Sequence, residues 1–357
     1  MEKELSIEQA RTKIDSIDHQ LLILLNERME IVKAIGDLKK TTKAAVYRPE
    51  REQAILSRLS ELSTGRLNAK AIDAIFLEIF AVSRNIELPE KVAFLGPEGS
   101  FTHQAAESRF GAMSEYIALK TIRSVFESVA TGRVRFGMVP VENNQEGIVT
   151  DTVNLLSNLD INIVAEIPMP IHFTFCSVND SVNSIKKIYS KDIAFGQCRE
   201  FIDNYFDENI ELVPVESTSR AALLASEDES SAAICSNIAA KMYNLPMLFE
   251  NIEDSANNYT RFLIISDDFK NQQSGNDKTT ILAKLSAEPG SLAKFLQNFY
   301  QAGINLTKIE SYPAKVGKTF NYQFLLEFEG HYLDENIDKI FKKHKEIKWL
   351  GSYPKLC

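Results

Sequence analysis

The chain has 357 residues, of which 44% are apolar and 25% are charged, and its formal net charge is −9. This length exceeds what one hydrophobic core usually serves, so we expect two or three domains of a globular protein. The negative charge argues against a nucleic-acid partner. No apolar run approaches the roughly 20 residues that a membrane span needs, so we expect no membrane contact.

The N-terminus and the cysteines both indicate a cytoplasmic protein. The first residues, MEKELSIEQAR, are charged and lack the apolar core of a signal peptide. No cysteine belongs to a C-x-x-C pair, and the spacing suits neither zinc nor a disulfide framework. We therefore expect reduced thiols, no metal ion and no cofactor. The four cysteines are Cys176, Cys198, Cys235 and Cys357.

Residues 1–90 are predicted to form an all-helical domain. Ser6 and Gln9 have the spacing of a capping box, and apolar residues then recur at helical spacing for more than 30 residues. Pro49 suits the start of a second helix, and a third is expected over about 68–87. A helix this long cannot bury its apolar stripe alone, so we predict a bundle completed by a second subunit.

Two further domains are predicted. Over residues 91–268, short apolar runs that indicate buried strands alternate with helical patterns, which predicts α/β layers. The polar stretch that begins at Asp267 is typical of a linker. Residues 278–357 follow a βαββαβ order, which predicts a ferredoxin-like sandwich of the α+β class.

Three basic residues of the helical domain have a distinctive spacing. Arg28 and Lys39 are eleven positions apart, about three turns, so they share one face of the predicted helix. Arg11 lies roughly 100° away from Arg28 around the axis. One helix cannot easily direct all three residues at one ligand, whereas two antiparallel copies could. The simpler interpretation is a solvated helix face.

These residues, together with Glu27 and the run YRPERE at 47–52, make residues 6–88 resemble the all-helical chorismate mutases. The resemblance implies an intertwined dimer that rearranges chorismate to prephenate, with each site built from both subunits. Arg11 of one subunit and Arg28 of the other would hold the two substrate carboxylates. A planar guanidinium suits this task because it can bind a carboxylate through two hydrogen bonds.

The same resemblance implies roles for further residues. Lys39 would donate to the ether oxygen of the substrate, Arg51 would support the site, and Glu52 would accept from the substrate hydroxyl. Arg48 departs from the acid found in relatives, and its role in substrate binding stays open. The reaction is pericyclic, so the protein need only fix one conformer and stabilise charge on the ether oxygen.

Glu87 matches the position of a second donor to that oxygen, where some relatives have glutamine. A carboxyl group donates only when it is protonated. The sequence therefore predicts a mutase activity that declines as pH rises. The alternative is that Glu87 only caps the end of its helix.

Hydroxyl residues of the second domain fall where helices are expected to begin. Ser100 and Thr102 follow a glycine turn, and Thr218 precedes another helical run. Helix N-termini with hydroxyl side chains bind small anions through free backbone N–H groups. Ordinary N-capping is the more common use of such residues.

Three runs make residues 91–268 resemble prephenate dehydratase: FLGPEGSFTHQAA at 94–106, GMVPVENNQEG at 137–147 and NYTRF at 258–262. The resemblance implies two α/β lobes, as in a type II periplasmic-binding protein, with a cleft between them. It also implies conversion of prephenate to phenylpyruvate with loss of carbon dioxide and hydroxide. The Thr260 hydroxyl would donate to the leaving hydroxide. The other matched substrate-site positions are Asn143, Ser190, Gln197 and Arg261.

The last domain resembles an ACT domain, a small-ligand regulatory module. The resemblance rests on EPGSLAKFL at 288–296 and ESYP at 310–313, where Tyr312 replaces the usual arginine. It implies that phenylalanine binds between paired domains and inhibits the dehydratase. The alternative is a domain used only for dimerisation. The matched effector positions are Pro289, Gly290, Ser291, Leu292, Glu310 and Ser311.

The order of the three resemblances is that of the bifunctional chorismate mutase/prephenate dehydratases. We therefore expect a homodimer or higher homo-oligomer that acts on chorismate and prephenate and takes phenylalanine as an allosteric effector. Two alternatives stay open. One is a dehydratase with a catalytically weak, regulatory mutase domain, and the other is a non-catalytic cytosolic amino-acid sensor.

Overall fold

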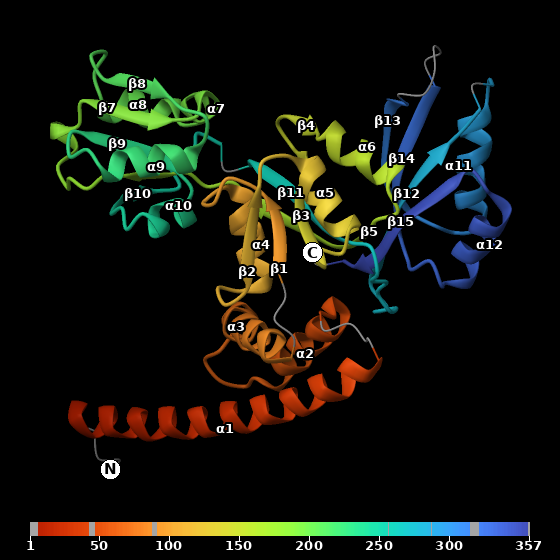
Figure 1. Ribbon diagram of the computed structural model, residues 1–357, viewed down its shortest axis with the longest axis horizontal. Coiled ribbons are helices and arrows are strands. Elements are labelled where there is room, and N and C mark those ends of the chain that lie inside the picture. Colours follow the sequence, from red (N-terminus) through yellow and green to blue (C-terminus); the bar gives the residue numbers. More distant parts are fainter. Residues whose placement is uncertain are drawn as a thin grey trace.

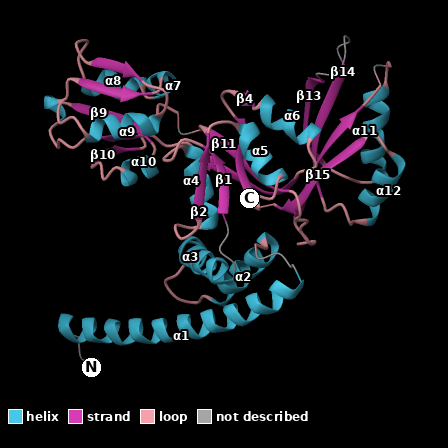
Figure 2. Cartoon of the chain, viewed as in Figure 1, coloured by secondary structure: helices cyan, strands magenta, loops and turns pink. Residues whose placement is uncertain are grey.

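The computed structural model describes residues 6–42, 47–87, 91–255, 257–286, 288–314 and 321–355. Figure 1 shows a helical N-terminal region below a first α/β lobe, a second α/β lobe on one side of it, and a C-terminal sheet with two helices on the other side. Figure 2 shows that the strands gather in three separate sheets. No helix of the described residues is long and apolar enough to cross a membrane.

The N-terminal region contains three helices, as the sequence predicts. Ser6 begins the first one as a capping box: its Oγ accepts from the N–H of Gln9 at 3.2 Å, and Gln9 Oε1 accepts from the N–H of Ser6 at 3.2 Å. The N-terminal half of the first helix extends past the other two (Figure 1). The helices are α1 (Ile7–Thr42), α2 (Pro49–Leu62) and α3 (Ala69–Glu87).

The first lobe has a mixed sheet with strand order β2-β1-β3-β11-β5, and β4 pairs with β3. Strands β1, β2 and β3 are parallel, whereas β11 is antiparallel to both β3 and β5. The strands are β1 (Lys91–Leu95), β2 (Glu115–Leu119), β3 (Phe136–Asn143), β4 (Gly147–Ile148), β5 (Asn162–Pro170) and β11 (Tyr259–Ser266). The helices are α4 (Phe101–Phe110), α5 (Ile122–Ala130) and α6 (Thr150–Asn158).

The second lobe is inserted between β5 and β11, so the chain crosses twice between the lobes. Its sheet has the order β10-β6-β9-β7-β8. The strands are β6 (Thr174–Cys176), β7 (Lys187–Ser190), β8 (Glu211–Pro214), β9 (Ser231–Cys235) and β10 (Met247–Glu250). The helices are the 3-10 turn η1 (Val182–Ser184), α7 (Asp192–Gln197), α8 (Arg199–Tyr205), α9 (Thr218–Ser226) and α10 (Asn237–Met242). The predicted two-lobed α/β arrangement is therefore present.

The C-terminal part has the predicted βαββαβ order around an antiparallel sheet, β13-β14-β12-β15. Alternate residues of β12 face opposite sides: Ile281 packs with the two helices, whereas Leu282 packs with the first lobe. Gly351 permits this docking, because a Cβ there would lie 2.2 Å from the Ile163 carbonyl oxygen. The elements are β12 (Asp277–Lys284), α11 (Ser291–Gln301), β13 (Leu306–Ala314), β14 (Asn321–Glu329), α12 (Glu335–Lys343) and β15 (Ile347–Pro354).

The polar stretch from Asp267 is not the free linker that its composition predicts. Phe269 and Asn271 are buried. The Asn271 side chain donates to the carbonyl oxygens of Val164 at 2.7 Å and Ser352 at 3.0 Å. This segment therefore fastens the C-terminal sheet to the first lobe.

Candidate active sites

A cavity of about 250 Å³ lies among the three N-terminal helices. Every residue that the sequence analysis assigned to a mutase site lines it, except Arg11. Basic side chains outnumber carboxylates in its lining, which suits a ligand with two negative charges. The charged lining residues are Arg28, Lys39, Arg48, Arg51, Glu52, Arg84 and Glu87.

Lys39 and Glu87 form an ion pair at one side of this cavity. Lys39 Nζ lies 2.5 Å from Glu87 Oε1, and the two side chains are 22% and 10% exposed. The pair joins the last turns of α1 and α3. It therefore brings together the two groups expected to contact the ether oxygen of the substrate.

Arg28 is held from α3 as well. Its Nη1 donates to the Ser83 hydroxyl, which in turn donates to the Ile79 carbonyl oxygen at 2.6 Å. Burial lowers the pKa of Arg28. The sequence analysis missed Ser83, although its place one turn before Glu87 puts both residues on the same helix face.

Glu52 is buried and is held by two arginines. Arg84 Nη1 pairs with Glu52 Oε1, and Arg109 Nη2 lies 3.5 Å from Glu52 Oε2. Arg84 Nη2 also donates to the Arg109 carbonyl oxygen at 3.0 Å. Arg109 belongs to α4, so the first lobe supplies part of the setting of Glu52.

Tyr47 connects the same two regions. It is fully buried, and its ring packs against Phe110 and Phe136 of the first lobe at centroid distances of 5.2 and 5.5 Å. Its hydroxyl accepts from Arg109 Nε at 2.7 Å. Burial raises the pKa of Tyr47, although the charge of Arg109 opposes this. No local sequence signal could have found Arg84 or Arg109, because their partners come from distant segments.

Arg11 lies on an exposed stretch of α1, away from this cavity. It is seventeen positions before Arg28, which is about 25 Å along a helix axis. Arg11 therefore cannot reach the cavity of its own chain. The same half of α1 exposes large apolar side chains, among them Ile14, Ile17, Leu21 and Leu24.

A second cluster of polar residues lies where β3 and β11 of the first lobe meet the second lobe. Asn143 and Thr260 are directly paired across the two strands. Asn143 Nδ2 donates to Thr260 Oγ1 at 2.8 Å and to Asn258 Oδ1 at 3.0 Å, and Asn258 Nδ2 donates to Gln197 Oε1 at 3.3 Å. The structure thus brings together Asn143, Thr260 and Gln197 from both lobes.

The Thr260 hydroxyl can act as a hydrogen-bond donor. Its oxygen accepts from Asn143, so its own proton can be directed to another acceptor. Asn143 is fixed in turn, because its Oδ1 accepts from the N–H groups of Gln145 at 2.8 Å and Glu146 at 3.0 Å. The hydrogen bonds around Asn143 therefore hold the Thr260 oxygen in place.

Two predicted substrate-binding residues lie elsewhere. Ser190 is fully buried at the end of β7 and donates to the Ile234 carbonyl oxygen at 2.7 Å, so its hydroxyl holds the sheet of the second lobe together. Arg261 follows Thr260 on β11, and consecutive strand residues point to opposite faces. This geometry favours a role for Arg261 outside the substrate cluster, and substrate binding by Arg261 stays a prediction.

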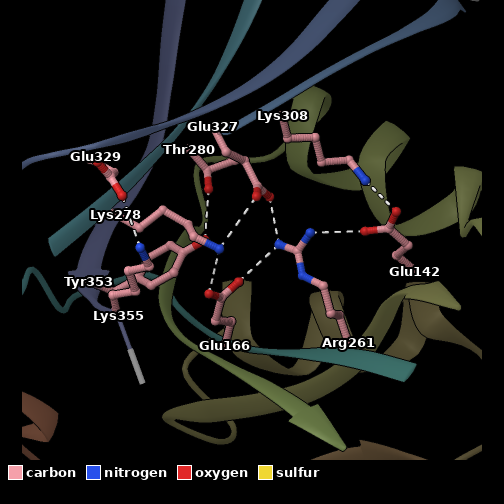
Figure 3. A network of polar contacts seen from close by, with 10 residues as sticks. All are labelled: Glu142, Glu166, Arg261, Lys278, Thr280, Lys308, Glu327, Glu329, Tyr353 and Lys355. Atoms are coloured by element: carbon pink, nitrogen blue, oxygen red, sulfur yellow. Dashed lines mark hydrogen bonds and ion pairs between the residues drawn. The ribbon is translucent and has the colours of Figure 1, made fainter. Parts of the chain in front are cut away.

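Arg261 instead joins a network at the C-terminal sheet (Figure 3). Its Nη1 lies 2.9 Å from Glu142, and its Nη2 lies 2.9 Å from Glu166 and 2.6 Å from Glu327. Burial alone would lower the pKa of Arg261, but the charges of Glu327 and Glu166 outweigh it and raise that pKa. The guanidinium of Arg261 thus forms ion pairs with three carboxylates.

The predicted helix N-termini are mainly capping sites. Ser100 Oγ accepts from the N–H of His103 at 3.3 Å, and Ser217, next to Thr218, accepts from the N–H of Arg220 at 3.0 Å. Ordinary N-capping, the alternative interpretation, therefore applies to Ser100. Thr102 is buried in the first turn of α4, and Thr218 is half-buried at the start of α9.

The glycine turn before α4 packs against the second lobe. Gly99 has a φ of +77°, and a Cβ there would lie 2.6 Å from Ser219 Oγ. Ser219 donates to the Glu98 carbonyl oxygen, and Ser236 donates to that of Gly99 at 2.6 Å. The turn therefore fixes the two lobes against each other beside the N-terminus of α9.

The predicted effector residues fall into two groups. Pro289 and Ser291 line a cavity of about 370 Å³ at the start of α11, and Gly290 there has a φ of +82°. Leu292 is half-buried in the first turn of α11. Glu310 and Ser311 lie on β13, an edge strand, and do not line this cavity. One copy of the chain does not bring the two groups together.

Tyr312, which replaces an arginine of the family motif, faces the first lobe. It is buried, and its hydroxyl donates to Gln323 Oε1 at 3.1 Å. Ser157 of α6 donates to the same oxygen at 2.9 Å. Tyr312 therefore belongs to the contact between the C-terminal sheet and the first lobe.

Two family models match the chain: chorismate mutase type II over residues 10–88 and prephenate dehydratase over residues 92–270. The two matches indicate an enzyme with two activities, an isomerase region followed by a lyase region. Both regions also occur together in relatives of the full length. A bifunctional chorismate mutase/prephenate dehydratase of Aquifex aeolicus is 41% identical, and the match covers 98% of each chain. One of Pseudomonas aeruginosa is 38% identical, with 97% of this chain and 96% of the relative covered.

A solved structure supports the same assignment. The prephenate dehydratase of Arthrobacter aurescens, in complex with L-Phe, matches with a TM-score of 0.66 and 31% identity, over 74% of this chain and 90% of that one. The chain belongs to the bifunctional chorismate mutase/prephenate dehydratase family. It acts in phenylalanine biosynthesis, converting chorismate to prephenate and prephenate to phenylpyruvate.

Proposed function

We propose that the cavity of the helical region is the chorismate mutase site and that a second copy of the chain completes it with Arg11. The supporting observation is that Arg28, Lys39 and Glu87 line one cavity, whereas Arg11 lies about 25 Å away along the same helix. The exposed apolar residues of α1 offer the surface on which a second copy would pack.

Each side chain then has a task in the rearrangement. Arg28 and the Arg11 of the second copy hold the two carboxylates and so select the compact conformer. Lys39 donates to the ether oxygen, where negative charge develops as the C–O bond breaks, and Glu87 would donate to it only in its carboxylic-acid form. Glu52, held by Arg84 and Arg109, accepts from the substrate hydroxyl.

The dehydratase site is proposed to lie at the Asn143–Thr260 pair between the lobes. The Thr260 hydroxyl donates to the departing hydroxide while Asn143 holds its oxygen. Loss of carbon dioxide supplies the electron pair that completes the aromatic ring. Gln197, which reaches the same cluster from α7 of the second lobe, is proposed to contact the substrate.

The C-terminal domain is proposed to be an ACT-type regulatory module that binds phenylalanine and inhibits the dehydratase. Support comes from the βαββαβ order, the left-handed Gly290 at the start of α11 and the cavity beside it. The Arthrobacter aurescens relative was solved with L-Phe. Glu310 and Ser311 would reach the ligand from a paired domain.

Feeding chorismate to the purified chain tests these assignments together. We expect prephenate to form and phenylpyruvate to follow, and added phenylalanine to slow only the second step. Prephenate conversion without chorismate conversion would indicate a regulatory mutase domain. A folded chain that binds phenylalanine and converts neither compound would indicate an amino-acid sensor.

A further inference from the structure

A charge-balanced network joins the dehydratase strands to the C-terminal sheet (Figure 3). Glu142 of β3, Glu166 of β5 and Arg261 of β11 come from the first lobe. Lys278 of β12, Lys308 of β13 and Glu327 of β14 come from the C-terminal sheet. Three cations thus meet three carboxylates across the domain boundary.

The contacts within the network are short. Lys308 Nζ pairs with Glu142 Oε1, and Lys278 Nζ lies 2.5 Å from Glu166 Oε1 and 3.5 Å from Glu327 Oε2. Burial alone would raise the pKa of Glu142, but its hydrogen bond to Lys308 and the charges of Lys308 and Arg261 outweigh burial and lower that pKa. Glu142 is therefore charged at neutral pH and is bound from both domains.

Two first-lobe members of the network are chain neighbours of proposed site residues: Glu142 precedes Asn143, and Arg261 follows Thr260. The register pairs Arg261 with Glu142 and Thr260 with Asn143, in adjacent rungs of the same two strands. Because side chains alternate, one rung faces the C-terminal sheet and the next faces the cluster between the lobes. A displacement of the first pair therefore moves the backbone that carries the second.

On the side of the C-terminal sheet, strand β13 carries Lys308, which contacts Glu142 of the first lobe. Lys308 precedes Glu310 and Ser311, the proposed effector residues, on this strand. Lys308, Glu310 and Ser311 all pair with β14, so they belong to one stretch of the same ladder. Ligand contact at Glu310 and Ser311 therefore lies within a few residues of the Lys308–Glu142 contact.

We propose that Arg261 is a positioning residue for the dehydratase and that the Lys308–Glu142 contact transmits the state of the C-terminal domain to Thr260 and Asn143. The first half depends on the Thr260 site, and the second half rests on the proposed function of the C-terminal domain as a phenylalanine module. Strands β3 and β11 carry the proposed dehydratase residues on one face and the contact with the C-terminal sheet on the other.

The first test separates positioning from substrate binding at Arg261. Arg261→Met combined with Glu327→Gln keeps the network balanced in charge, and Glu327→Gln alone is the matched control. We expect the double variant to lower the dehydratase kcat at least tenfold, with KM for prephenate within about threefold of the control. Arg261→Lys should recover part of kcat. Mutase turnover in the same preparation reports on folding.

A raised KM with unchanged kcat would return Arg261 to substrate binding and overturn the positioning role. Unchanged values of both constants would overturn it as well.

The second test addresses coupling, with L-phenylalanine as the probe and the full chain as the sample. For Lys308→Met we expect calorimetry to show bound phenylalanine, while at least half of the uninhibited dehydratase rate remains at saturating ligand. Lys308→Arg should stay inhibited. Lys339→Met, on an exposed lysine of α12 outside the network, removes the same charge from the same domain and should behave as the wild type.

Full inhibition of Lys308→Met would overturn the coupling and leave the phenylalanine site intact. Wild-type chain that binds no phenylalanine would instead overturn the regulatory function and the coupling with it. The Arg261 measurement decides the positioning role in either case.

Discussion

At the residue scale, both proposed sites depend on a hydrogen-bond donor fixed by a neighbour. Glu87 lies against Lys39, and Thr260 lies against Asn143. Asn143 donates to the Thr260 oxygen and so leaves the Thr260 proton for another acceptor, whereas the ion pair with Glu87 holds the Lys39 ammonium group at the side of the cavity. The chemistry of each step is therefore sensitive to changes of one or two atoms.

Glu87 should make the mutase reaction depend on pH. A carboxyl group donates only when protonated, whereas the amide of Glu87→Gln donates at every pH. We expect the wild-type kcat/KM for chorismate to fall as pH rises and the Glu87→Gln profile to be flat over the same range. The dehydratase profile, measured from prephenate, should be the same in both proteins. Flat mutase profiles in both would refute the donor role of Glu87.

At the element scale, helix α4 serves two regions of the chain. Its N-terminus carries Ser100, and its last turn carries Arg109, which reaches Glu52 in the mutase cavity. The burial of Tyr47 against Phe110 holds α4 and the start of α2 together. Glu52, which lines the cavity of the helical region, is therefore paired with a charge that the first lobe supplies.

Arg109→Met should impair the mutase selectively. It removes one of the two guanidiniums that hold the Glu52 carboxylate while it preserves much of the side-chain volume. We expect kcat/KM for chorismate to fall about tenfold, with kcat/KM for prephenate within about twofold of the wild type. Arg109→Lys should recover part of the loss. A parallel fall in both activities would point to general unfolding, and no change would show that Glu52 does not need Arg109.

The helices and the central strands could be predicted from the sequence because each has a local signal. The capping box at Ser6 and the helical spacing of α1 are complete within one segment. Strands β2, β8 and β10 lie at sheet edges and are partly exposed, and their apolar runs of three or four residues are too short to distinguish a strand from other structure.

The site predictions divide in the same way. Helical spacing places Arg28 and Lys39 on one face of α1, and both line the same cavity. Arg261 could not be placed in this way, because the motif places it beside Thr260 in sequence while the strand directs it to the opposite face. Arg109 could not either, because its partner Glu52 is more than fifty residues away and in another domain.

At the scale of the whole molecule, a single copy leaves the mutase cavity without Arg11 and leaves apolar residues of α1 exposed. In a symmetric dimer each copy would supply Arg11 to the cavity of the other and would cover the apolar residues of the other α1, since the same surface is used twice. The N-terminal half of α1 extends past α2 and α3 (Figure 1), so its exposed apolar residues are open to contact with another copy.

Subunit complementation tests this arrangement. Arg11→Ala and Arg28→Ala should each abolish most mutase activity as pure proteins. If each site takes Arg11 from one subunit and Arg28 from the other, mixed dimers contain one intact site. Random co-assembly should then restore about a quarter of the wild-type activity, because half of the dimers are mixed and each has one working site of two. Absence of any recovery in co-assembled protein would place both arginines in one subunit.

The most direct test of the account is the product distribution from chorismate in Thr260→Ala. Two separate sites in one chain predict that this variant converts chorismate at the wild-type rate, accumulates prephenate and forms phenylpyruvate at least about a hundredfold more slowly. Phenylpyruvate formation at the wild-type rate would contradict the assignment of the second step to Thr260. Loss of prephenate formation in a folded protein would contradict the separation of the two sites.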